Sequence, residues 1–217
     1  NLLNEDIGKD KTFFVGNVMI DTLLKHREKA KKSDILKRHS LKKKKYCVLT
    51  LHRPSNVDNI KNIENIISII KKIQEKFCIV FPMHPRTNKN LSLFGLQNKL
   101  LESSEQIKKE NLKLIPPAGY LDFLCLMDNS KFVLTDSGGI QEETTVLGVP
   151  CITLRKKTER PVTVEQGTNV IVSTDKNKII KAAFRLINGA KIKRRVPHLW
   201  DGNASKRIVT ILLSKLK

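Results

Sequence analysis

The sequence predicts an α/β protein with a Rossmann-like, doubly wound parallel sheet. Six short segments are continuously apolar, which is typical of strands that helices cover on both faces. Longer segments with helical periodicity separate them, and Gly or Pro stands at most strand exits. Strands and helices that alternate in this way need right-handed crossovers and form a parallel sheet. The predicted strands are residues 45–51, 77–82, 112–115, 131–135, 150–154 and 169–173.

The clearest predicted helix carries a stripe of isoleucines at positions 60, 63, 66, 67, 70 and 73. This i, i+3, i+4, i+7 spacing places the side chains on one helix face. Further helical patterns cover residues 120–127, 140–147 and 176–187, and a last helix is expected at about 203–216. We therefore expect one Rossmann-like domain of about residues 15–200, followed by a C-terminal helix.

Length and composition exclude two classes of protein. The chain has 217 residues, of which 40% are hydrophobic and 29% charged, so it can bury a proper core and is not expected to be disordered. No apolar run approaches the roughly 20 residues of a membrane helix, so no membrane partner is expected. The chain opens with NLLNEDIGKDKTFFVGN, without Met or a signal peptide, and we expect it to be a piece of a longer protein.

Basic residues give the chain a net charge of +20, and eleven of them lie in residues 25–45. Within that segment only Glu28 and Asp34 oppose them. A basic stripe can grip phosphates, but nucleic-acid grooves usually add aromatic side chains for base stacking. No Phe, Tyr or Trp occurs in the segment before Tyr46. A solvated helix face and linker is therefore the favoured interpretation, and no nucleic-acid partner is expected.

The cysteines indicate a reducing, cytoplasmic setting. Cys47, Cys78, Cys125 and Cys151 are far apart in sequence, and each lies within an apolar run. Reduced core thiols fit this pattern better than disulfides or zinc ligands. No metal-ligand spacing is present, and no metal or other cofactor is expected.

Polar and glycine residues gather where the predicted strands end. In an open parallel sheet these carboxyl ends form one rim, and ligands bind beyond it. The rim is rich in His, Arg, Ser and Gly, a combination that suits an anionic ligand. Its segments are residues 52–56, 84–87, 116–120, 136–139 and 155–160.

The strongest motif on this rim is TDSGGIQEE at residues 135–143. It follows a strand and opens a helix, so Gly138 and Gly139 would let a phosphate approach free backbone N–H groups. Ser137 could donate its hydroxyl to that phosphate or could simply cap the helix. In the second case the motif is an ordinary turn, and the two glutamates complement the helix dipole. Neither a P-loop nor a GxGxxG motif is present.

Three other rim positions have both a functional and a structural interpretation. His52 and Arg53 end the first strand, and a phosphate or acid–base role there is as plausible as a structural one. For His84, a structural His-Pro turn is slightly favoured. Arg160 could reach phosphates, while Glu159 could pair with an arginine as scaffold.

Six motifs in collinear order resemble the non-hydrolysing UDP-N-acetylglucosamine 2-epimerases of bacteria and archaea. They are VGNVMIDTLL (15–24), LTLHRPSNVDN (49–59), FPMHPRT (81–87), LTDSGGIQEETTVLGVPCITLR (134–155), TERPVTVEQGTN (158–169) and WDGNASKRI (200–208). The resemblance implies a two-domain GT-B fold, of which this chain would be the C-terminal, UDP-binding half. The N-terminal Rossmann domain, which brings the catalytic carboxylates, would be missing.

The resemblance also implies a reaction: UDP-GlcNAc and UDP-ManNAc interconvert by elimination and re-addition of UDP, without NAD or metal. A homodimer is implied for the full-length enzyme. Carried over by motif, His52 is catalytic, and the UDP- or substrate-binding residues are Arg53, His84, Ser137, Gly138, Gly139, Glu143 and Arg160. Many members carry HRREN where this chain has HRPSN.

Three alternatives remain open at this point. A GT-B glycosyltransferase domain would share the phosphate site and the ribose carboxylate, and a hydrolysing epimerase would release free ManNAc. A basic module that binds nucleotides or nucleic acid is the non-enzymatic alternative.

Overall fold

The computed structural model describes residues 2–101, 111–192 and 194–216. Its centre is a six-stranded parallel sheet with the strand order β3-β2-β1-β4-β5-β6. Each strand lies within a predicted range, so the predicted doubly wound α/β fold is confirmed. The strands are β1 Tyr46–Thr50, β2 Cys78–Pro82, β3 Leu112–Ile115, β4 Val133–Thr135, β5 Cys151–Thr153 and β6 Asn169–Ile171.

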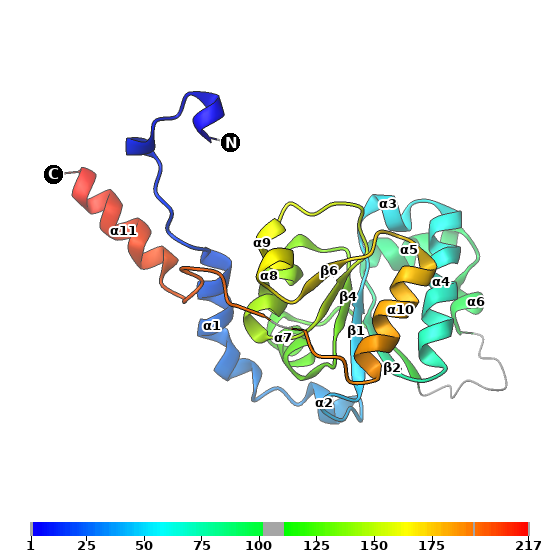
Figure 1. The fold of residues 1–217 in the computed structure, drawn as a ribbon. Helices are drawn as coiled ribbons and strands as arrows, with labels where there is room; N and C mark the ends of the chain where they lie inside the picture. Colours follow the sequence, from blue (N-terminus) through cyan, green and yellow to red (C-terminus); the bar gives the residue numbers. More distant parts are fainter. Residues whose placement is uncertain (1, 102–110, 193, 217) are drawn as a thin grey trace.

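Helices cover both faces of this sheet (Figure 1). Along β1 the side chains alternate: Cys47 and Leu49 face the α4 and α10 side, whereas Tyr46 and Val48 face the α1, α7 and α8 side. Both faces are therefore apolar, which explains the continuously apolar strands. The predicted helices are α4 Ile60–Gln74, α7 Tyr120–Asn129, α8 Gly138–Leu147, α10 Lys176–Ile187 and α11 Ala204–Lys215.

The structure also contains helices for which no bounds were predicted, although a solvated helix face was expected within residues 25–45. They are α1 Val18–Ala30, α2 Ile35–Arg38, α3 Pro54–Val57, α5 Pro85–Leu93, α6 Gln97–Leu101 and α9 Pro161–Glu165, with short 3-10 turns at Leu2–Glu5 and Lys9–Lys11. The basic segment 25–45 comprises the last part of α1, α2 and the loop into β1. Two of its arginines pair with α7, Arg27 with Asp128 and Arg38 with Asp122.

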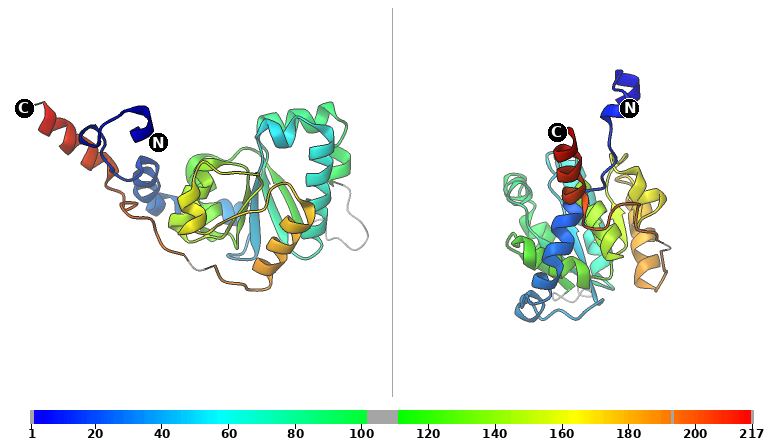
Figure 2. Two further views of the ribbon diagram at one scale, coloured as in Figure 1. Left: turned by 45° about the horizontal axis from the view of Figure 1, so that its top comes forward. Right: turned by 90° about the vertical axis from the view of Figure 1, so that its left-hand side faces the viewer.

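An arm formed by residues 2–15 and α11 projects from the body beyond α1 (Figures 1 and 2). The body holds it at Asp21 of α1, whose carboxylate accepts the backbone N–H groups of Ala204 and Ser205 at 3.0 and 2.7 Å. Gly16 has a φ of +99°, and a Cβ there would lie 2.2 Å from the carbonyl oxygen of Leu199. Only glycine fits at this position, where the segment before α1 passes close to the loop before α11.

The four cysteines all lie in the described part of the chain, and none forms a disulfide. This agrees with the predicted core thiols, since Cys47, Cys125 and Cys151 are buried. No helix in the described ranges is long and apolar enough to cross a lipid bilayer.

Candidate functional site

The candidate site lies where the connections of two neighbouring strands leave the sheet in opposite directions. β1 and β4 are adjacent in the sheet. The chain that leaves β1 passes to α4 on one face, while the chain that leaves β4 enters α8 on the other. Such a switch point forms a crevice beyond the carboxyl ends of the strands. His52 and Ser137 follow these two strands.

Asp136 connects the two strand ends. Its side chain is fully buried, and its Oδ2 accepts the backbone N–H of His52 at 3.1 Å and that of Arg53 at 2.9 Å. The Nδ2 of the buried Asn56 donates to the same oxygen at 3.0 Å. The turn after β1 is therefore built around a carboxylate from β4, a role that the sequence analysis missed.

The two predicted histidines lie close together, with ring centroids 5.5 Å apart. His52 Nδ1 lies 2.9 Å from Oδ1 of Asp136, and its side chain is 36% exposed. His84 Nδ1 accepts the backbone N–H of Arg86 at 3.2 Å and so caps α5. Arg86 in turn pairs with Asp58. The geometry of His84 matches its structural interpretation, whereas His52 is held by Asp136 and remains partly exposed.

The N-terminus of α8 lacks a side-chain cap. Ser137 is the N-cap residue, but its side chain makes no capping hydrogen bond. Its backbone N–H instead donates to Oγ1 of Thr135 at 3.0 Å. An ordinary serine cap, the structural alternative for this motif, is therefore not what the structure contains. The first-turn N–H groups remain available at the positive end of the helix dipole.

The two glycines of this turn leave space beside the backbone. A Cβ at Gly138 would meet no atom closer than Glu159 Oε2 at 3.8 Å. A Cβ at Gly139 would lie 2.8 Å from Cε of Met19, the flexible end of a side chain from α1. Neither glycine has a positive φ. The missing side chain therefore opens space at Gly138, whereas Met19 occupies that space at Gly139, and neither glycine is required for the backbone conformation.

Glu143 lies on α8, where it is only 7% exposed. The hydroxyl of Tyr120 donates to its Oε1 at 3.3 Å. Burial raises the pKa of the Glu143 carboxyl to about 7, the Tyr120 hydrogen bond opposes the shift, and the charge of Glu142 adds to it. A buried carboxylate with a single long hydrogen bond can accept further hydroxyl donors.

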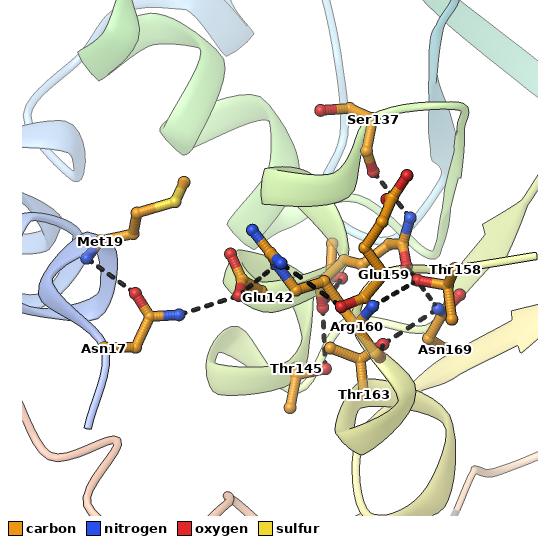
Figure 3. Close-up of polar contacts among 12 residues, drawn as sticks. Asn17, Met19, Ser137, Glu142, Thr145, Thr158, Glu159, Arg160, Thr163 and Asn169 are labelled. Carbon is orange, nitrogen blue, oxygen red and sulfur yellow. Dashed lines mark hydrogen bonds and ion pairs between the residues drawn. The ribbon is translucent and has the colours of Figure 1, made fainter. Parts of the chain in front are cut away.

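Arg160 and Glu142 form an ion pair beside α8, with Nε and Oε1 2.8 Å apart (Figure 3). Glu142 is only 4% exposed, and Nδ2 of Asn17 donates to the same Oε1 at 2.9 Å. Burial raises the pKa of Glu142, while Arg160 and Asn17 oppose that shift. The sequence analysis treated Glu142 only as a possible dipole partner and so missed this contact. A cleft of about 740 Å³ adjoins the pair and is lined in part by Asn17, Met19 and Trp200.

Gln141 fastens the loop before α9 to α8 and to β6. Its Nε2 donates to the carbonyl of Ser137 at 3.0 Å, while its Oε1 accepts Thr158 Oγ1 at 2.6 Å and Asn169 Nδ2 at 3.0 Å. Figure 3 shows Thr158 and Asn169 close together beside α8. Glu159 pairs with Arg155, which is the arginine contact that its scaffold interpretation expects. Arg160 is thereby held near the start of α8.

The geometry suits an anion with hydroxyl groups. A helix N-terminus, Arg53, Arg160 and His52 supply positive charge or N–H donors, and Glu143 is an acceptor one turn along α8. Within the described residues, no group of three or more His, Cys, Asp or Glu side chains is placed to hold a metal ion.

Comparison with known proteins gives one consistent result. A family model described as UDP-N-acetylglucosamine 2-epimerase matches residues 1–213. The UDP-N-acetylglucosamine 2-epimerase of Methanocaldococcus jannaschii is 42% identical over 98% of this chain and 57% of its own length. Its structure in complex with UDP-GlcNAc and UDP superposes with a TM-score of 0.83.

Less similar structures share the same fold. The epimerase of Neisseria meningitidis bound to UDP-GlcNAc has a TM-score of 0.80 at 34% identity, over 98% of this chain and 58% of that one. A UDP-forming trehalose-phosphate synthase from Burkholderia xenovorans, 11% identical with a TM-score of 0.61, shares the fold over 91% of this chain and 50% of its own. The chain spans a little over half the length of the epimerases it matches.

Proposed function

Because this chain belongs to the UDP-N-acetylglucosamine 2-epimerase family, we propose that it is the UDP-binding portion of an enzyme that interconverts UDP-GlcNAc and UDP-ManNAc. The observation that carries this proposal is the uncapped N-terminus of α8 beside His52 at the β1–β4 switch point. We assign the diphosphate to Ser137, Gly138 and Gly139, because backbone N–H groups and the helix dipole favour a phosphate there.

The reaction proceeds by elimination of UDP and its re-addition with the opposite stereochemistry at C2. Negative charge accumulates on the leaving diphosphate, and preorganised positive groups stabilise that transition state. His52 and Arg160 are these groups, together with the N-terminus of α8. Arg53 and His84 line the same rim as further substrate contacts.

UDP must stay bound while the sugar intermediate reorients, which requires contacts to the uridine part that do not depend on the sugar. Glu143 supplies one by accepting the two ribose hydroxyls. Its burial and single 3.3 Å hydrogen bond support this role, since the hydroxyls would provide the missing donors.

The chain is, in this proposal, the C-terminal half of a two-domain GT-B enzyme, and the rest of the protein brings the catalytic carboxylates. Two observations support it. The chain covers 57% of the Methanocaldococcus relative, and the projecting arm exposes large apolar side chains, among them Phe14, Leu212 and Leu213, that more protein would cover. We further propose a homodimer that works in the cytoplasm, where the buried thiols stay reduced.

The test compares this chain with the complete protein in one assay. The 217-residue chain should bind UDP weakly and leave UDP-GlcNAc unchanged, whereas the complete protein should form UDP-ManNAc, followed by proton NMR. Isomerisation by the chain alone would contradict the division of the site between two domains. Release of free ManNAc would identify a hydrolysing epimerase, and transfer of the sugar to an acceptor a glycosyltransferase.

A further inference from the structure

Asp136 has no role in the proposed reaction, yet it is fully buried beneath the candidate site. In the part of the chain that the structure describes, His52 is the only basic side chain within ion-pair distance of it. Its other partners are neutral donors, namely two backbone N–H groups and the amide of Asn56. Arg155, which pairs with Glu159, also interacts electrostatically with the Asp136 charge. His52 is thus the direct basic contact of a buried carboxylate, which raises the question of a role beyond closing a turn.

The hydrogen-bond pattern determines which nitrogen of His52 carries the proton. An ionised carboxylate only accepts hydrogen bonds. Oδ2 of Asp136 accepts three donors. Oδ1 faces Nδ1 of His52 at 2.9 Å and shares the backbone N–H of His52 at 3.3 Å. Nδ1 must therefore be a donor, so a neutral His52 is protonated on Nδ1. This is the less populated tautomer of a free neutral imidazole.

We propose that Asp136 is a positioning residue that keeps the proton of neutral His52 on Nδ1 and directs Nε2 to the diphosphate. The identity of the diphosphate rests on the proposed function. When Nε2 also carries a proton, His52 is an imidazolium that donates to the leaving phosphate oxygen, and the Asp136 carboxylate compensates its charge. The arrangement holds the ring in place before the transition state forms.

Asp136→Asn separates this role from turn closure. Asparagine keeps one oxygen, which can still accept the three donors now at Oδ2, but it places an NH2 group opposite Nδ1. Two donors cannot face each other, so His52 should change to the tautomer protonated on Nε2. The turn is retained while the direction of the His52 hydrogen bond reverses.

Nitrogen NMR of the complete protein labelled with 15N-histidine reads the tautomer directly, and His52→Gln assigns the signal. The wild type should show neutral His52 protonated on Nδ1, and Asp136→Asn should show it protonated on Nε2. Asp128→Asn, which alters an acidic residue at the far end of α7, should leave the tautomer unchanged. A wild-type signal from the Nε2-protonated form would overturn the inference, even if Asp136→Asn fails to fold.

Kinetics of the complete enzyme provide a second readout. Asp136→Asn should lower kcat by between about 10-fold, as for groups that orient a metal-bound histidine, and about 10⁴-fold, as for the aspartate of a Ser-His-Asp triad. It should leave KM within about twofold. In the His52→Ala background the same substitution should cost little more, because the two residues act as a unit. An equal loss with and without His52 would refute the positioning role. If the tautomers behave as expected but the wild type does not isomerise UDP-GlcNAc, the proposed function fails and the contact stands.

Discussion

The guanidinium of Arg160 is held against the carboxylate of Glu142, with Nε 2.8 Å from Oε1. The two residues come from different elements, the N-cap of α9 and the first half of α8. Because Glu142 is buried and Arg160 is 45% exposed, the carboxylate fixes the Nε edge of the guanidinium. Nη1 donates to the carbonyl of Glu159 at 3.3 Å, and the remaining exposed N–H groups can reach a ligand. Glu142 thus contributes to the site indirectly, by holding the side chain of Arg160.

We expect Glu142→Gln to weaken UDP binding through Arg160. The amide keeps the size of the side chain but loses the charge that orients the guanidinium. The pair is partly exposed, so the change should cost about 1 kcal/mol of binding free energy, which is roughly fivefold in affinity. Calorimetric titration with UDP measures it. In an Arg160→Ala background the substitution should have no further effect, and a full fivefold loss there would exclude a role through Arg160.

Glu143→Gln should weaken UDP binding about tenfold or more. Each hydrogen bond to a charged group is typically worth ~1.5–3 kcal/mol, and ~1.4 kcal/mol corresponds to one decade in affinity. The loss should be much smaller for a 2′,3′-dideoxyuridine nucleotide, which offers no ribose hydroxyls. Glu64→Gln, on the exposed surface of α4, is the matched control. Equal losses for both nucleotides would remove Glu143 from the ribose site.

The raised pKa of Glu143 predicts a pH dependence of stability. Its carboxyl has a pKa of about 7 in the fold and 4.5 ordinarily, so between these values the folded chain holds a proton that the unfolded chain has released. The free energy of unfolding should therefore fall as pH rises from about 4.5 to about 7, by about 3 kcal/mol. Urea unfolding of wild type and Glu143→Gln at several pH values isolates this effect, because the other groups titrate in both proteins. If the difference between their free energies of unfolding does not vary with pH, the prediction is wrong.

Gly139→Ala should separate folding from ligand binding. The new methyl group would displace only the flexible end of Met19, and alanine favours the helix more than glycine, so the melting temperature should be unchanged or slightly higher. UDP binding should weaken on the order of tenfold, through loss of one close hydrogen bond to a charged group. The double variant with Met19→Ala should bind UDP as weakly as Gly139→Ala alone. Restored affinity would show that the alanine methyl group acts only by displacing Met19.

Local sequence patterns were sufficient for the sheet and for helices with a strong apolar stripe. All six strands and α4, α7, α8, α10 and α11 lie where periodicity placed them. For α1 only a solvated helix face within residues 25–45 was predicted, because its lysines on the exposed face obscured the buried Ile20 and Leu23. Helices α5 and α9 each begin with a proline directly after a rim residue, and their patterns are too short to separate from loops.

The polar contacts of the site depend on strand order, which a single sequence does not reveal. Asp136 and His52 are 84 residues apart, and only the adjacency of β1 and β4 brings them together. An aspartate directly after a buried strand was a usable signal, but without strand order it had no identifiable partner. Arg160 and Glu142 were both visible in sequence, and their pairing required the path of the loop before α9.

The most direct test is an amide NMR titration of this chain with UDP. If UDP binds at the start of α8, the largest shift changes should fall on Ser137, Gly138, Gly139 and His52, and Glu143→Gln should weaken the response. Changes concentrated instead in the basic pocket formed by Ser55, Asn56 and residues 155–157, with none at the start of α8, would contradict binding there.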